Sequence, residues 1–291
     1  HTADLMIDIK ANTLATDINI SGKDSVAVTD FAVRLFQQSA EDGKNTLISP
    51  LSVLSALAMT ANGAGGQTLS QMEGVFGLSI LELNEYLSAY IKALPAGEKY
   101  KLSIANSIWF KDDESFTVNP NFLQANADRY GAGVYKAPFD SSTLRDINSW
   151  VEEETDGMIR DILDRIPEEA VMYLVNALAF DAEWQNIYYD HQVSDGVFTK
   201  EDGTQQQAEL MYSTEYQYLE NENAAGFMKY YTDRKYAFAA LLPDEGISIA
   251  KYVASLSGEQ LAALLANPVD VQVNAAIPKF KSEYSVELSD I

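Results

Sequence analysis

The ten residues Val171–Phe180, VMYLVNALAF, form an almost wholly apolar run with one amide, Asn176, in its middle. Trp184 follows four residues after the run ends. A short run rich in Val, Leu, Tyr and Phe is typical of a strand buried on both faces, because a strand with one wet face would alternate. A buried Asn without hydrogen-bond partners costs about 1–3 kcal/mol, so we expect polar side chains on neighbouring elements. The run therefore predicts the middle strand of a large sheet that carries an unusual polar feature.

The composition is that of a soluble globular protein, with 291 residues of which 47% are hydrophobic. This length allows one or two domains. The net charge of −23 and the pI of about 4.3 argue against nucleic acid as a partner, because nucleic-acid binders concentrate Lys and Arg. The acidic residues are dispersed rather than blocked, which favours a solvated surface over a docking site for a basic partner.

The sequence contains no cysteine, which excludes disulfides, thiolate metal sites and a cysteine nucleophile without fixing the compartment. No apolar stretch approaches the ~18–20 residues of a membrane span. The chain starts at His1 rather than Met and has no apolar signal core, so we expect a processed or engineered chain.

Helices are predicted mainly in the first half, after a polar and loosely held lead-in over residues 1–24. Apolar side chains recur at helical spacing from Ser25, after the Ser49-Pro50 cap, after a Thr68/Gln71 capping box, over about 80–93, after Asn119-Pro120 and over 143–156. Two short helices are expected later, at 248–256 and 258–266, the second capped by Ser257 with Gln260.

Strands dominate the second half of the chain. They are predicted at 46–48, 102–110, 133–139, 171–180, 197–199, 205–212, 215–220, 227–232, 236–242, 269–275 and 277–284. Because helices come first and antiparallel strands later, the fold class is α+β. No linker or repeat divides the chain, so we expect one domain over residues 25–291.

Signatures of catalysis are missing. His1 and His191 are the only histidines, no G-x-S-x-G elbow is present, and a catalytic triad would have to use His191. Residues 63–66 lack the preceding strand and following Lys-Ser/Thr of a phosphate loop, and the acids at 112–114 lack calcium-loop spacing and favour a hairpin tip. Glycosidase chemistry stays open from carboxylate spacing alone. We expect neither a cofactor nor a metal.

Several segments, read in order, resemble one family, the serpins. They are Asn45–Leu57 (NTLISPLSVLSAL) with Ala61–Gly66 (ANGAGG), Ile147–Leu163 (INSWVEEETDGMIRDIL), Val171–Tyr188, Phe198 with Asp202-Gly203 and Met211, Ala240–Glu245 (ALLPDE), and Ala276–Phe280 (AIPKF). The resemblance covers residues 25–291, and several independent segments in the correct order make it specific. It implies helices packed around a large central mixed sheet, with two smaller antiparallel sheets.

The resemblance also implies a function, that of a protease inhibitor rather than an enzyme. In serpins a target serine or cysteine protease attacks an exposed reactive loop and forms an acyl-enzyme. The cleaved loop then inserts as an extra strand into the central sheet and distorts the protease before deacylation. Insertion requires a sheet whose backbone hydrogen bonds can be remade around the new strand.

Four residues match serpin positions at which the sheet opens. Asn176 matches the Asn of the family's "shutter", where the sheet parts, and Ser49 and Ser52 match the small polar residues of the helix beneath. Trp184 matches the tryptophan where insertion begins. The alternative is that Ser49 only caps a helix and that Trp184 only packs in the core.

The chain departs from the family pattern at Ile291, where serpins continue into another strand and the reactive loop. We therefore expect the reactive bond beyond Ile291 and a second chain or fragment that carries the missing strands. The favoured reading is a serpin-type inhibitor that is secreted or held at the cell surface. The alternatives are a serpin-like binding or chaperone-like protein without inhibitory activity, and a hydrolase that uses His191.

Overall fold

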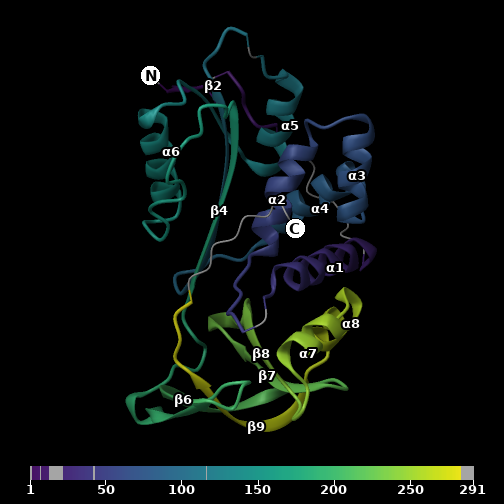
Figure 1. Ribbon diagram of the computed structural model, residues 1–291, viewed down its shortest axis with the longest axis vertical. Coiled ribbons are helices and arrows are strands. Elements are labelled where there is room, and N and C mark those ends of the chain that lie inside the picture. Colours follow the sequence, from purple (N-terminus) through teal and green to yellow (C-terminus); the bar gives the residue numbers. More distant parts are fainter. Residues whose placement is uncertain (1, 7, 13–21, 42, 116, 283–291) are drawn as a thin grey trace. The chain divides into compact units, whose positions relative to one another are not determined.

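The computed structural model describes residues 2–6, 8–12, 22–41, 43–115 and 117–282 (Figure 1). The helices are α1 (Gly22–Ser39), α2 (Pro50–Ala61), α3 (Gly66–Phe76), α4 (Ile80–Ala93), α5 (Pro120–Tyr130), α6 (Ser141–Glu154), α7 (Ile249–Ser255) and α8 (Gly258–Ala266). The strands are β1 (Ala3–Asp4), β2 (Tyr100–Lys111), β3 (Gly133–Ala137), β4 (Met172–Ala182), β5 (Val193–Thr199), β6 (Gln205–Glu220), β7 (Ala224–Tyr230), β8 (Ala237–Pro243) and β9 (Val269–Pro278). The order of these elements confirms the α+β class.

Contacts divide the chain into two compact units. The first unit comprises His1–Val28 and Ser49–Asp181, and the second comprises Thr29–Ile48 and Ala182–Ile291. Each unit contains one of the two sheets.

Two helix starts follow the predicted capping. At the start of α2 the backbone N–H of Ser52 donates to Ser49 Oγ, and Pro50 occupies the first turn, where its missing N–H costs nothing. At the start of α8, Ser257 and Gln260 form the expected capping box.

Three local predictions are wrong. The helix α3 begins at Gly66, with Gly65 as an N-cap that makes no side-chain bond, so Thr68 lies inside the first turn instead of capping it. Residues 46–48 form no strand, because no described strand pairs with them. Residues 112–114 do not form a hairpin tip. After β2 the chain leaves the sheet and returns through helix α5 to β3, which runs parallel to β2.

The first unit is built on a four-stranded mixed sheet in the order β1-β3-β2-β4. Strands β2 and β3 run parallel, with Ile108 opposite Val134, and β1 pairs antiparallel to β3. Part of the predicted lead-in thus belongs to this sheet, and the N–H of Leu5 also donates to the Val134 carbonyl at 2.9 Å.

Helix α6 covers one face of this sheet, and α5 lies on the other side of β2 and β4 (Figure 1). The buried core residues between α6 and the sheet are Trp109, Ala137, Ile147, Val151, Val175 and Ala177. This cluster confirms the predicted inward positions Ile147 and Val151 of α6.

The prediction that β4 is buried on both faces is wrong. Val175, Ala177 and Ala179 are buried, whereas the alternate residues are only half-buried and Phe180 is exposed. The strand with two buried faces is β2, in which the six residues 105–110 are all buried. The reason lies in the strand order, since β2 has neighbours on both sides, whereas β4 pairs only with β2 among the described residues.

The second unit is built on a five-stranded antiparallel sheet, ordered β5-β6-β7-β8 with β9 paired to β6. Gly226 of β7 lies against β8, where an added Cβ would come within 1.8 Å of the Ala240 carbonyl oxygen. Only glycine permits this approach.

Two strand boundaries in this unit differ from the prediction. β6 is one continuous strand over 205–220 rather than two, because a register shift between Glu215 and Gln217 bends it without ending it. β9 likewise runs unbroken from Val269 to Pro278, and residues 279–282 form no strand. The end of the predicted strand, at residues 283–284, lies outside the described residues.

Candidate functional site

Asn176, in the middle of β4, meets the predicted polar partner. Its Nδ2 donates to Asn106 Oδ1 of β2 at 2.8 Å. Its own Oδ1 is buried and has no hydrogen-bond partner among the described residues. The expectation of a polar neighbour is confirmed, and half of the Asn176 amide remains uncompensated within the described part of the chain.

The hydrogen bonds continue from Asn106 into the helices of the first unit. Asn106 Nδ2 donates to the Tyr130 carbonyl at the end of α5 at 2.9 Å, and the Tyr130 hydroxyl donates to Asn84 Oδ1 of α4 at 2.6 Å. Asn84 Nδ2 donates to Asn62 Oδ1, just after α2, at 2.8 Å. Burial raises the pKa of Tyr130 well above its usual value and keeps its hydroxyl a donor. We call Asn62, Asn84, Asn106, Tyr130 and Asn176 the amide chain.

Ser49 and Ser52 interact with each other rather than with this chain. Ser49 Oγ donates to Ser52 Oγ at 3.1 Å and accepts from the Ser52 backbone N–H at 3.4 Å. Both residues are half-buried at the start of α2. No hydrogen bond among the described residues joins either serine to Asn176, so the three do not form one bonded cluster.

Trp184 lies in the second unit, two residues after β4. It forms an isolated antiparallel bridge with Tyr231, and the two rings stack at 4.3 Å with an interplanar angle of 8°. Phe238 of β8 meets the indole edge-on at 5.8 Å. The Trp184 ring therefore packs between an aromatic residue just after the end of β7 and another at the start of β8.

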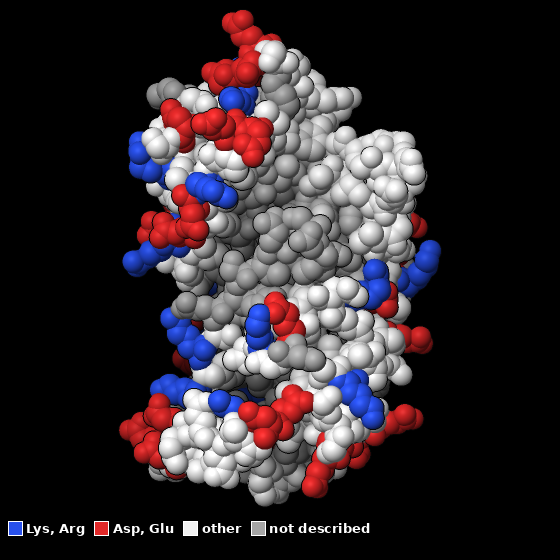
Figure 2. All heavy atoms as spheres, viewed as in Figure 1, with Lys and Arg blue, Asp and Glu red and all other residues white. Residues whose placement is uncertain are grey.

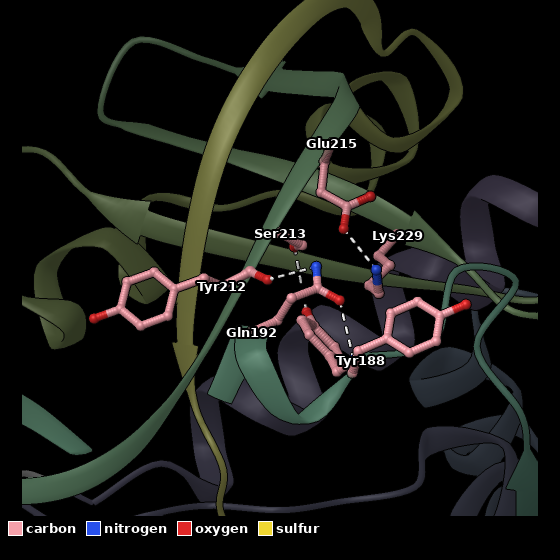
Figure 3. A network of polar contacts seen from close by, with 7 residues as sticks. Tyr188, Gln192, Tyr212, Ser213, Glu215 and Lys229 are labelled. Carbon is pink, nitrogen blue, oxygen red and sulfur yellow. Dashed lines mark hydrogen bonds and ion pairs between the residues drawn. The ribbon is translucent and has the colours of Figure 1, made fainter. Parts of the chain in front are cut away.

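A buried ion pair lies beside Trp184 and was not predicted. Lys229 Nζ of β7 binds Glu215 Oε1 of β6 at 2.6 Å, and their side chains are only 2% and 8% exposed (Figure 3). The same ammonium lies 4.7 Å from the Tyr188 ring centroid and 5.6 Å from that of Trp184. The available signal was a lone Lys inside the apolar strand AAGFMKY, and its partner could not be read from spacing along the sequence.

His191, the residue on which a hydrolase would depend, is exposed and stacks on Tyr189 with ring centroids 5.9 Å apart. Residues 63–66 join α2 to α3 as a turn. Within the described ranges no group of three or more His, Cys, Asp or Glu side chains could hold a metal ion, and no helix is long and apolar enough to cross a membrane. Acidic and basic side chains are interspersed on the face shown in Figure 2.

Comparison with known proteins identifies the fold. The family profile described as Serpin (serine protease inhibitor) matches residues 26–291. The crystal structure of tengpin, a thermophilic serpin, in the native state has a TM-score of 0.94 at 48% identity and covers 99% of this chain and 75% of its own. The crystal structure of tengpin in the latent state matches with a TM-score of 0.88 at 49% identity. This match covers 94% of this chain and 75% of the tengpin chain.

Two curated relatives are more distant. An uncharacterised serpin-like protein of Thermococcus kodakarensis is 27% identical over 275 residues, 91% of this chain and 63% of its own length. A leukocyte elastase inhibitor of Xenopus tropicalis is 27% identical over 282 residues, 91% of this chain and 74% of its own length. The chain thus spans less than two thirds of the archaeal protein.

The chain belongs to the serpin family. Serpins are for the most part inhibitors that target proteases, not catalysts.

Proposed function

We propose that this protein is a protease inhibitor that traps its target by a conformational change. The observation that carries the proposal is family membership across nearly the whole chain, residues 26–291. The occurrence of native and latent states in the 48–49% identical tengpin supports a fold with more than one stable arrangement. The inhibitor of leukocyte elastase among the relatives supports a protease as partner.

The chemical step belongs to the protease. Its serine or cysteine nucleophile attacks a carbonyl of the reactive loop, the peptide bond breaks, and the amine leaves with a proton from the protease's general acid. The loop remains bonded to the protease as an ester (serine) or thioester (cysteine) while it adds to the central sheet as a strand. We place the loop, with its reactive bond, in the part of the relatives' length that this chain does not cover.

Within this proposal the four residues have separate roles. Asn176 marks the point at which the sheet parts, on the side of β4 that faces away from β2, while its bond to Asn106 holds β4 to β2. Ser49 and Ser52 exchange hydrogen-bond partners beneath the sheet, which small hydroxyls do without a large volume change. Trp184 marks the end at which insertion begins. The proposal also places the protein outside the cell, either secreted or held at the cell surface.

The test is to mix full-length protein with serine and cysteine proteases and to look for a covalent complex that survives SDS. We expect a complex with at least one active protease. The same protease with its nucleophile replaced by Ala serves as the control and gives none, because no ester can form. Plain cleavage by every protease, with no complex, would contradict inhibition and favour a non-inhibitory binding role.

A further inference from the structure

The chain that leaves β4 is fastened at several points to the sheet of the second unit. The N–H of Gln185 donates to the Tyr230 carbonyl at 3.1 Å, and the N–H of Thr232 donates to the Glu183 carbonyl at 2.9 Å. These backbone bonds flank the Trp184–Tyr231 bridge. The segment 183–185 is therefore fastened to the end of β7 by an isolated bridge and two flanking backbone hydrogen bonds.

Further along, the same connection is fastened to β6. The Tyr188 hydroxyl lies 3.4 Å from Ser213 Oγ, and Gln192 Nε2 donates to the Tyr212 carbonyl at 3.3 Å (Figure 3). The Lys229 ammonium lies near the rings of both Trp184 and Tyr188. We call residues 183–192 the exit segment.

Stability alone does not account for the Lys229–Glu215 pair. A buried ion pair seldom stabilises a fold more than apolar residues of similar volume, because both charges lose their hydration. Its geometry is specific, since the register shift after Glu215 lies where this carboxylate meets Lys229 across the sheet. The Lys229 ammonium also attracts the Trp184 and Tyr188 rings through cation–π interactions, which an apolar side chain at this position could not make.

We infer that Lys229 is a positioning residue that holds the exit segment closed and so sets the rate at which the sheet accepts the loop. The inference rests on the proposed function and deepens it. If insertion begins near Trp184, the Trp184 and Tyr188 rings must shift from Lys229 before a strand can enter beside β4. Their attraction to the ammonium is then part of the barrier that keeps the native form from converting spontaneously.

The experiment compares full-length protein with the Lys229→Met/Glu215→Met double variant. Replacing both partners avoids an uncompensated buried carboxylate, so the variant folds. We expect the double variant to have an unfolding midpoint close to that of the unaltered protein. At a fixed elevated temperature it should convert to the loop-inserted form at least tenfold faster, as monitored by native gel electrophoresis. The fraction of protease trapped per inhibitor should fall, because more molecules convert or are cleaved without trapping.

Lys279→Met/Glu209→Met is the matched control, because this ion pair is exposed and its removal, like that of Lys229 and Glu215, leaves the net charge unchanged. It should convert at the unaltered rate. The fluorescence emission of Trp184, obtained as the difference from a Trp184→Phe variant, should shift in the double variant and stay unchanged in the control. A loss of packing far from Trp184 would not produce this shift.

The outcomes separate the two proposals. If the unaltered protein traps no protease and yields no loop-inserted form, the proposed function fails and the inference fails with it. If the unaltered protein does both and the double variant converts within twofold of its rate, Lys229 does not control opening and the inference alone is overturned. A Trp184 emission unchanged in the double variant would also overturn it.

Discussion

At the level of single residues, the Asn176 amide is only half compensated within the described part of the chain. Its Nδ2 donates to Asn106 Oδ1, while its Oδ1 is buried and accepts no hydrogen bond from the described residues. A buried acceptor of this kind raises the free energy of the arrangement that contains it. Any state in which Asn176 Oδ1 gains a donor is favoured by comparison.

Asn176→Ala should lower the free energy of unfolding by about 1–3 kcal/mol, since Asn106 Oδ1 loses its donor. The decrease in the free energy of unfolding should lie near the lower end of this range, because the variant also removes the uncompensated Asn176 Oδ1. Urea denaturation measures this change in stability. The control is Asn121→Ala, because Asn121 of α5 is exposed and its replacement should change stability by less than about 0.5 kcal/mol. If the thermal midpoints of the native and loop-inserted forms both stay unchanged, Asn176 has no part in sheet opening.

Tyr130 gives a prediction in alkaline solution. Its folded-state pKa is raised above the ordinary value of 10.0 by burial, so above pH 10 the unfolded chain loses this proton before the folded chain does. The contribution of Tyr130 is therefore complete below pH 10 and decreases as the pH rises above it, by about 1.4 kcal/mol per pH unit.

Tyr130→Phe separates this effect from those of the other tyrosines. At pH 8 the variant should be less stable by about 1 kcal/mol, because the bond to Asn84 Oδ1 is lost. Between roughly pH 10 and 11.5 the advantage of the unaltered protein should shrink and then reverse, as followed by urea denaturation. An advantage that stays constant over this range would contradict the raised pKa of Tyr130.

At the level of elements, the start of α2 decides between two readings of Ser49. Ser49→Ala should lower the free energy of unfolding by about 0.5–2 kcal/mol, because the N–H of Ser52 loses its cap. Ser49→Asp keeps a capping oxygen and should restore this stability. If Ser49→Asp also converts to the loop-inserted form at the unaltered rate, Ser49 is only a cap; a changed rate at restored stability supports a role for its small hydroxyl in sheet opening.

Prediction from sequence succeeded where the signal is local. The Ser49 and Ser257 caps depend on residues within one helical turn, and both are present as expected. The expected burial of β4 failed because it depends on strand order, which places β2 rather than β4 between two neighbours. The Lys229–Glu215 pair was missed for the same reason, since pairing of β6 with β7 brings together residues fourteen positions apart.

The amide chain shows the same limit within the candidate site. The sequence predicted that Asn176 would have polar partners, because an isolated amide in an apolar strand is costly. It did not indicate that the bonds continue through Asn106 and Tyr130 to Asn84, because these residues come from three separate elements. The resemblance supplied single positions such as Asn176, whereas the connections between positions required the fold.

At the level of the whole molecule, the dominant property is charge. The chain carries 43 acidic against 20 basic residues, for a net charge of −23. Both signs are interspersed on the face shown in Figure 2, so this face presents no single acidic patch, and the net charge is the long-range feature that a charged partner meets.

If the protein traps proteases, a cationic target should associate faster at low salt than an anionic target of the same class, because a net charge of −23 attracts the first and repels the second. The rate constant for complex formation with the cationic protease should fall by about tenfold between roughly 0.05 and 0.5 M NaCl, while that with the anionic protease rises or stays level. Stopped-flow measurement of trapping gives both rates, and a neutral osmolyte at equal viscosity controls for diffusion. The same salt dependence for both proteases would show that association is governed by local contacts of the reactive loop, and that the acidity of the chain has no part in choosing the target.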